Sequence, residues 1–238
     1  MVDTGNAIAL CGNHEHNAIC FNFKTKNGFL REHSIKNFKQ HSETLLQFHG
    51  NQKLYNEAIE WFKTLPLYYK DENFNAVHAT YDSISIDYLQ LHTKNGVLSE
   101  EQYHLLADNN SQLFKAVEIT CKGMEIKLSN DQYFLDKDGT KRVHIRTKWW
   151  LDPTKNSLHN LSIIPGLSIN SNESLESTNY YKEDGKPVFF GHYWLKGRPI
   201  LFRDNICCTD FSVAKDGFLC AYRFNGEKIL SNENFIYV

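Results

Sequence analysis

The chain has 238 residues, of which 41% are hydrophobic and 13% aromatic, enough to bury a sizeable core as one large domain or two small ones. Its formal net charge is -2, whereas binding to nucleic acid or to an anionic membrane through charge needs a clear excess of Lys and Arg. We therefore expect no nucleic acid and no membrane as partner, and a ligand that is small or mildly charged.

The cysteines and the N-terminus bear on the cellular compartment. No C-x-x-C spacing occurs among the six cysteines, so we expect reduced, partly buried thiols instead of a disulfide framework or a zinc ribbon. The residues MVDTGNAIALCGN include neither the basic region nor the long apolar core of a signal peptide. No apolar run reaches the roughly 18 residues of a transmembrane helix. These features predict a cytoplasmic location.

The first part of the chain has mainly helical patterns. Ala7 to Cys11 is a short apolar run of the kind that forms a buried strand, and residues 15–23 have a helical pattern. Ser34 has the chemistry of an N-cap and is expected to begin a second helix. Apolar residues at i, i+3, i+4 and i+7 from Tyr55 to Phe62 predict a third helix, which Pro66 stops.

The pattern then changes to mixed and finally to mostly β. A hairpin is predicted from residues 67–70 and 74–79 around the polar turn DEN, followed by helical pieces over residues 83–123. From Met124 on, short predicted strands alternate with turn residues. A stretch rich in Ser, Asn and Glu at about 156–186 predicts a long surface loop. Hairpin turns are expected at Asp216-Gly217 and Asn225-Gly226.

Three polar residues follow predicted apolar strands closely: Asn13 after AIALCG, His78 after FNAV and His192 after VFFG. The carboxyl ends of strands are where an α/β sheet gathers its ligands. One histidine in such a place is more often structural, so the joint pattern is what indicates a site.

With these motifs, GNHE at 12–15, VHA at 77–79 and GHYW at 191–194, the sequence resembles the calcineurin-like metallophosphoesterases. This family includes protein serine/threonine phosphatases and diadenosine tetraphosphatases, and the closest resemblance is to a bacterial branch. The resemblance implies an α/β fold with a two-sheet β-sandwich flanked by helices, and two metal ions at the strand ends. It implies that Asn13, His78 and His192 bind the second metal, and that His14 protonates the leaving oxygen. This set of an amide oxygen and two neutral imidazoles suits manganese, iron or zinc better than magnesium or calcium.

The family's other metal motifs are absent from the chain. GDxHG and GDxxDRG do not occur, because no Gly-Asp pair exists in the 238 residues. The resemblance therefore implies a single domain over residues 1–238 that is N-terminally truncated, without its first β-α-β segment and with a helical insert at about 24–66. Without carboxylate ligands, we expect at most one weakly held ion. The missing segment is also expected to favour self-association through an exposed sheet edge.

Several residues keep two interpretations. Arg146 is the best remaining candidate for a phosphate-binding guanidinium, and the alternative is a pair with a surface carboxylate. The aromatic residues from Trp149 to Trp194 could line a cleft, but core packing is the more common role. His16 is expected in solvent or as a helix cap, and the alternative is that it reaches the site. Core packing is preferred for Cys207 and Cys208 over redox chemistry.

The function that follows is a hydrolase, a metallophosphoesterase acting on a phosphate ester or anhydride in a small molecule, dinucleotide or phosphoprotein. The alternative is a catalytically inactive homologue that serves as a binding module or is a remnant. A third interpretation discards the family and treats the β-rich half as a ligand-binding barrel. The substrate and the identity of the metal do not follow from the sequence.

Overall fold

The computed structural model describes residues 1–128, 132–135, 139, 141–164 and 180–238. Their contacts divide the chain into two compact units. Unit 1 consists of Met1–Tyr69 and Ile84–Cys121, and unit 2 of Lys70–Ser83 and Lys122–Val238. The chain therefore leaves unit 1, contributes a short segment to unit 2, returns to unit 1 and then completes unit 2.

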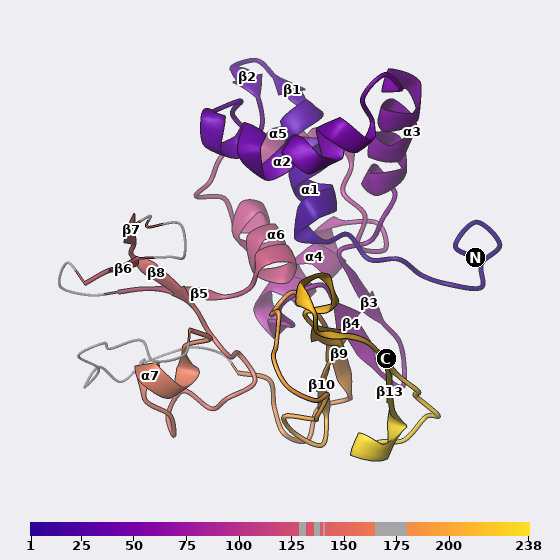
Figure 1. Ribbon diagram of the computed structural model, residues 1–238, viewed down its shortest axis with the longest axis vertical. Helices are drawn as coiled ribbons and strands as arrows, with labels where there is room; N and C mark the ends of the chain where they lie inside the picture. The colour runs from indigo at the N-terminus through magenta and orange to yellow at the C-terminus, as the bar shows by residue number, and fades with distance from the viewer. Residues whose placement is uncertain (129–131, 136–138, 140, 165–179) are drawn as a thin grey trace. The chain divides into compact units, whose positions relative to one another are not determined.

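Unit 1 is largely helical, as the sequence predicts (Figure 1). The Ser34 hydroxyl caps the second helix by accepting the Asn37 N–H at 3.4 Å, and the Asn51 side chain caps the third by accepting the Leu54 N–H at 3.1 Å. The helices and the small hairpin of this unit are α1 (Asn13–Asn22), β1 (Lys24–Thr25), β2 (Gly28–Phe29), α2 (Ile35–Gln47), α3 (Gln52–Lys63), α4 (Ser83–His92), α5 (Glu100–Leu105) and α6 (Gln112–Lys122).

A hydrophobic cluster joins the helices of unit 1. Ala18 of α1 packs with Tyr55 and Ile59 of α3, which are four residues apart and therefore lie on one face of the helix. The cluster also fixes a polar chain: the Tyr55 hydroxyl accepts from the Asn22 amide at 2.6 Å and bonds His41 Nε2 at 2.8 Å. The core of this unit thus includes a buried imidazole.

Unit 2 is built around parallel strands. β4 (Asn75–Val77), β9 (Val188–Phe190) and β10 (Ile206–Cys208) lie in the order β10-β9-β4, and both pairs are parallel. Their inward residues are almost fully buried, as parallel strands covered on both faces require. The turn before β4 is tight, with the Asp71 N–H donating to the Phe74 carbonyl at 3.1 Å. β3 (Tyr68–Lys70) is the segment in which the chain passes from unit 1 to unit 2.

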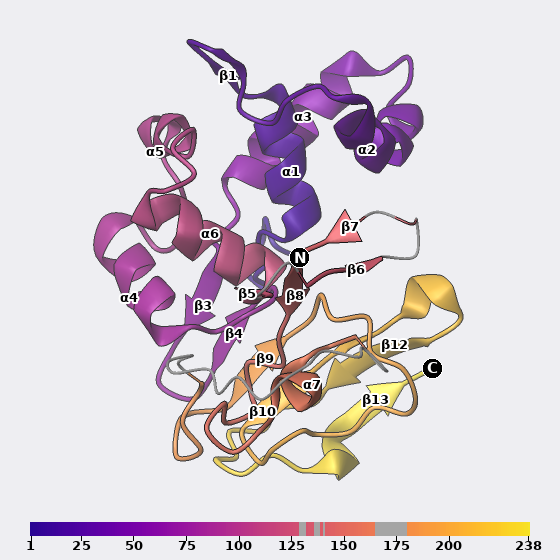
Figure 2. The same ribbon diagram turned by 90° about the vertical axis from the view of Figure 1, so that its left-hand side faces the viewer.

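The remaining strands of unit 2 form small antiparallel sheets. The chain returns along β12 beside β13, and Figure 2 shows these two strands side by side. Gly217 allows this return, because a Cβ there would lie 1.9 Å from the Phe211 carbonyl oxygen. The elements are β5 (Glu125–Lys127) with β8 (His144–Arg146), β6 (Phe134–Leu135) with β7 (Lys141–Arg142), β11 (Asp210–Phe211) with β12 (Phe218–Tyr222), and β12 with β13 (Phe235–Tyr237).

Four local predictions were wrong. Ala7–Cys11 forms no strand in the described structure, and Ile8 is 58% exposed. A four-residue helix, α7 (Leu158–Leu161), forms inside the predicted loop at 156–186, because Ser157 accepts the Asn160 N–H as a cap. Residues 165–179 of that predicted loop lie outside the described residues. No strand directly follows Asn225-Gly226, and Trp149-Trp150, at the end of the predicted strand KRVHIRTKWWL (141–151), lies in a turn.

The fold is therefore of the mixed α/β class, with its strands distributed over sheets of two to four members. Among the described residues, no helix combines the length and the apolar character needed to cross a membrane.

Candidate functional site

The structure brings two of the predicted site residues into contact. His78 follows the last residue of β4 and His192 lies two residues beyond β9, so both leave the same end of two adjacent parallel strands. His78 Nε2 and His192 Nδ1 are 3.1 Å apart, and their rings are inclined at 62°. This is the arrangement expected at the carboxyl edge of a parallel sheet.

The backbone around this histidine pair is fixed by three successive hydrogen bonds. The His78 carbonyl accepts the Gly191 N–H at 2.9 Å, and the Ala79 carbonyl accepts the Trp149 indole N–H at 3.1 Å. The Thr80 hydroxyl bonds the Tyr193 hydroxyl at 2.9 Å, a contact that satisfies both groups inside the protein. Burial raises the pKa of Tyr193, so this hydroxyl stays protonated. His78 and His192 are thus presented by rigid segments.

The loop after β9 has a strained backbone. His192 has φ 72° and Trp194 has φ 51°, both in the left-handed region that bulky residues rarely adopt. Asp210 holds this conformation: one carboxylate oxygen accepts the Trp194 N–H at 3.0 Å and the other accepts the Ser212 N–H at 3.1 Å. Strain of this kind persists where the surroundings enforce it, and it is concentrated at functional sites.

Asp210 was not selected from the sequence. The nearest signal was local, because an Asp that accepts the N–H two residues later forms an Asx turn. Its bond to Trp194 joins residues 16 positions apart and has no local signature.

Arg146 lies in β8, and its side chain is partly occupied. A guanidinium nitrogen is 3.6 Å from a carboxylate oxygen of Glu125 on the neighbouring strand β5, where about half of the Glu125 side chain is exposed. This is the pair that the alternative interpretation expected. The arginine stem also passes close to Gly123, where a Cβ would lie 2.9 Å from Arg146 Cδ and 3.1 Å from the Tyr193 hydroxyl.

Asn13 and His14 belong to unit 1, whereas both histidines of the pair belong to unit 2. They are the first two residues of α1, with Asn13 half-buried and His14 exposed. The Glu15 carboxylate accepts the Gly12 N–H at 3.0 Å, so this part of the GNHE motif closes the start of the helix. The participation of Asn13 and His14 in one site with the two histidines stays a prediction from the sequence.

His16 corrects a prediction. It is neither in solvent nor a cap: it is 3% exposed and lies one turn before Cys20, with 3.5 Å between its Nε2 and the thiol sulfur. Positions i and i+4 share a helix face, and the face of α1 that carries this pair is buried. Cys207 and Cys208 are fully buried, and burial raises the pKa of both thiols, in agreement with core packing.

Most of the aromatic residues near the pair are core. Trp149, Trp150, Phe190 and Tyr193 are each at most 4% exposed, and their rings pack mainly edge to face. Trp194 is the exception, with 47% of its surface exposed. The division between core and surface therefore falls inside the GHYW motif.

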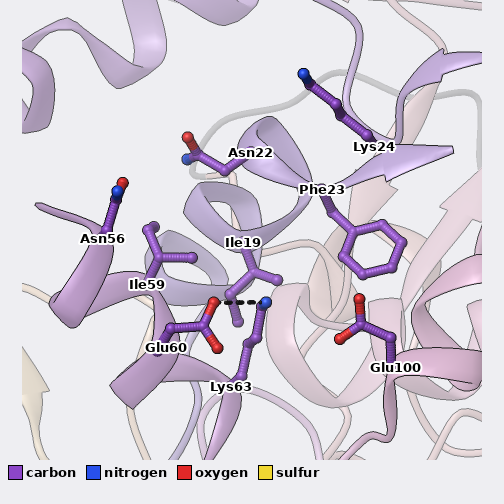
Figure 3. Close-up of a pocket in the computed structure, with 9 residues that line it drawn as sticks. All are labelled: Ile19, Asn22, Phe23, Lys24, Asn56, Ile59, Glu60, Lys63 and Glu100. Atoms are coloured by element: carbon purple, nitrogen blue, oxygen red, sulfur yellow. Dashed lines mark hydrogen bonds and ion pairs between the residues drawn. The ribbon is translucent and has the colours of Figure 1, made fainter. Parts of the chain in front are cut away.

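A separate cavity of about 440 Å³ lies in unit 1, between α1, α3 and α5 (Figure 3). Its charged groups are paired in part, since Lys63 donates to Glu60 at 2.7 Å, and Asn22 is committed to Ala18 and Tyr55. The cavity contains none of the predicted site residues. We therefore place the candidate site at the histidine pair.

The 3.1 Å between the two imidazole nitrogens is a hydrogen-bond distance between the rings. Imidazole nitrogens are also common ligands of divalent metal ions. In the part of the chain that the structure describes, no group of three or more His, Cys, Asp or Glu side chains could hold a metal ion. The pair thus brings together two of the three ligands that the sequence predicts.

Comparison with known proteins gives no further identification. No protein-family model matches the chain, and no curated protein matches it either.

Proposed function

We propose that the chain is a metallophosphoesterase-like domain that hydrolyses a phosphate ester or anhydride with metal-activated water. The observation that supports the proposal is the contact between His78 and His192 at the ends of β4 and β9, with 3.1 Å between the ring nitrogens. These are two of the three positions that the GNHE, VH and GH motifs designate as metal ligands. The proposal includes the two-sheet sandwich of that family.

In this proposal the residues have distinct tasks. His78 and His192 hold a divalent ion of the manganese, iron or zinc type, with Asn13 as the third ligand. When bound, such an ion lowers the pKa of a coordinated water and polarises a phosphoryl oxygen. His14, which is exposed at the first turn of α1, donates a proton to the leaving oxygen. Asp210 keeps the loop of His192 in its strained conformation.

The test measures manganese binding by titration calorimetry and hydrolysis of p-nitrophenyl phosphate in the same samples. We expect His78→Ala and His192→Ala to abolish both. The matched control is His144→Ala, which removes an exposed histidine of the same unit and leaves both intact. Manganese binding that survives both substitutions would contradict the proposed ligand pair.

A second candidate is a binding module without catalytic activity. The absence of GDxHG and GDxxDRG favours it, because those motifs supply the carboxylates that offset the charge of a two-metal site. Manganese binding that needs both histidines, together with no phosphatase activity in the unmodified chain, would identify this second candidate.

A further inference from the structure

A groove of about 590 Å³ lies in unit 2, beside the loop that carries His192. Its volume is within the range of about 300–1,000 Å³ that small-molecule sites occupy. The groove shares Tyr193 and Trp194 with the GHYW motif, so one of its walls begins next to the proposed metal ligand. Its other lining residues include Lys148, Leu151, Asn160 and Lys196.

Trp194 forms an aromatic platform on this wall. The residue is 47% exposed, and its backbone is held in the left-handed region by the bond to Asp210. Two more bonds fix the following residue: the Leu195 N–H donates to the Asp210 carbonyl at 3.1 Å, and the Leu195 carbonyl accepts from Ser212 at 3.0 Å. The Lys215 ammonium lies 4.2 Å from the centre of the indole ring. The structure thus keeps a large ring in contact with solvent on a rigid support.

The groove is also cationic. Lys148 lies on the groove wall, and its ammonium donates to the Asn160 carbonyl at 3.1 Å. Burial lowers the pKa of Lys148, which shows that its charge is partly removed from water. Neither Asp nor Glu is among the described residues that line the groove. A partly desolvated ammonium with no described carboxylate on the same wall can stabilise an anion.

We propose that this groove binds a planar aromatic ring that bears a phosphate, with the ring stacked on Trp194 and the anionic group near Lys148 and Lys196. Aromatic rings stack on Trp with little dependence on which ring is presented, and ammonium groups bind phosphate as point charges. The inference names a class of substrate for the proposed phosphoesterase, and it rests on that function for the ligand's role as substrate. Binding itself needs no metal.

The experiment measures AMP binding to the whole chain in the presence of a chelator, by quenching of tryptophan fluorescence and by calorimetry. Trp194→Gly removes the ring and suits the left-handed backbone, so it adds no strain to the loop. We expect it to weaken AMP binding about 5- to 150-fold, the range for one stacked base. Lys148→Met keeps the length of the side chain and should weaken binding about tenfold. The fluorescence control is Trp61→Phe, which removes an exposed tryptophan of unit 1.

In the unmodified chain, ribose 5-phosphate, which lacks the ring, should bind more weakly than AMP. In Trp194→Gly, ribose 5-phosphate and AMP should bind with equal affinity. AMP binding that is undetectable, or unchanged in Trp194→Gly, would overturn the inference, as would equal affinities for AMP and ribose 5-phosphate in the unmodified chain. AMP could bind as expected while neither AMP nor p-nitrophenyl phosphate is hydrolysed with manganese. That result would contradict the proposed phosphoesterase function and support the binding of AMP in the groove.

Discussion

Replacing Asp210 with alanine tests whether one carboxylate holds the loop of His192 in place. The carboxylate accepts the N–H groups of Trp194 and Ser212 at 3.0 and 3.1 Å. Hydrogen bonds to a charged group contribute about 1.5–3 kcal/mol each, and for the half-buried Asp210 the lower value applies. Loss of both bonds therefore removes about 3 kcal/mol of local stability. The left-handed backbone of His192 and of Trp194 costs about 1–3 kcal/mol each, so the loop is expected to relax.

Native-state hydrogen exchange measures this directly, because the Trp194 amide is one of the donors. A loss of about 3 kcal/mol corresponds to exchange that is about 150-fold faster. Manganese affinity should fall about 10- to 100-fold, as it does when a residue that orients a metal ligand is removed. Asp210→Asn retains one acceptor oxygen and should give intermediate values. Unchanged exchange at Trp194 in Asp210→Ala would refute this account of the loop.

Three further outcomes are expected. Gly123→Ala should destabilise unit 2 by about 1–3 kcal/mol in urea unfolding, because Gly123 has φ 95° and its new Cβ would lie 2.9 Å from Arg146 Cδ. Burial, followed by nearby cationic groups, lowers the pKa of His41 from 6.5, so its neutral form is favoured in the fold and bonds Tyr55. Unit 1 should therefore keep this stabilisation above pH 6.5 and lose it as the pH falls below that value. The midpoint of urea unfolding should change less between pH 7.5 and pH 5.5 in His41→Gln than in the unmodified chain. In a chain that hydrolyses phosphate esters, His14→Ala should lower kcat far more than it lowers metal content; equal losses would make His14 a ligand or a structural residue.

The helices could be predicted because their signals are local. Ser34 caps α2, and α3 ends before Pro66. The meeting of His78 and His192 could be anticipated only because both follow apolar strands. The pairing of β4 with β9 has no local signature, since the two histidines are 114 positions apart.

The failures have physical causes too. Ala7–Cys11 is apolar enough for a strand, yet its described hydrogen bonding to other segments is confined to Cys11, whose N–H donates to the Pro66 carbonyl. An apolar run without a neighbouring strand does not form a ladder. Asp210 was missed because its importance depends on a strained loop, and backbone strain is invisible in composition or periodicity. His16 was misjudged because the buried face of α1 is set by tertiary packing.

The order of the segments along the chain constrains how the protein can be made. Residues 84–121 belong to unit 1 but lie between β4 and β9 in sequence. They contain all of α5 and nearly all of α4 and α6. During synthesis His78 therefore leaves the ribosome long before His192. Strand β4 cannot pair with β9 until about half of the chain has been synthesised after it. Parallel pairings of such sequence separation form slowly and leave strand edges open meanwhile. The contact between the two imidazoles can therefore form only after this late step.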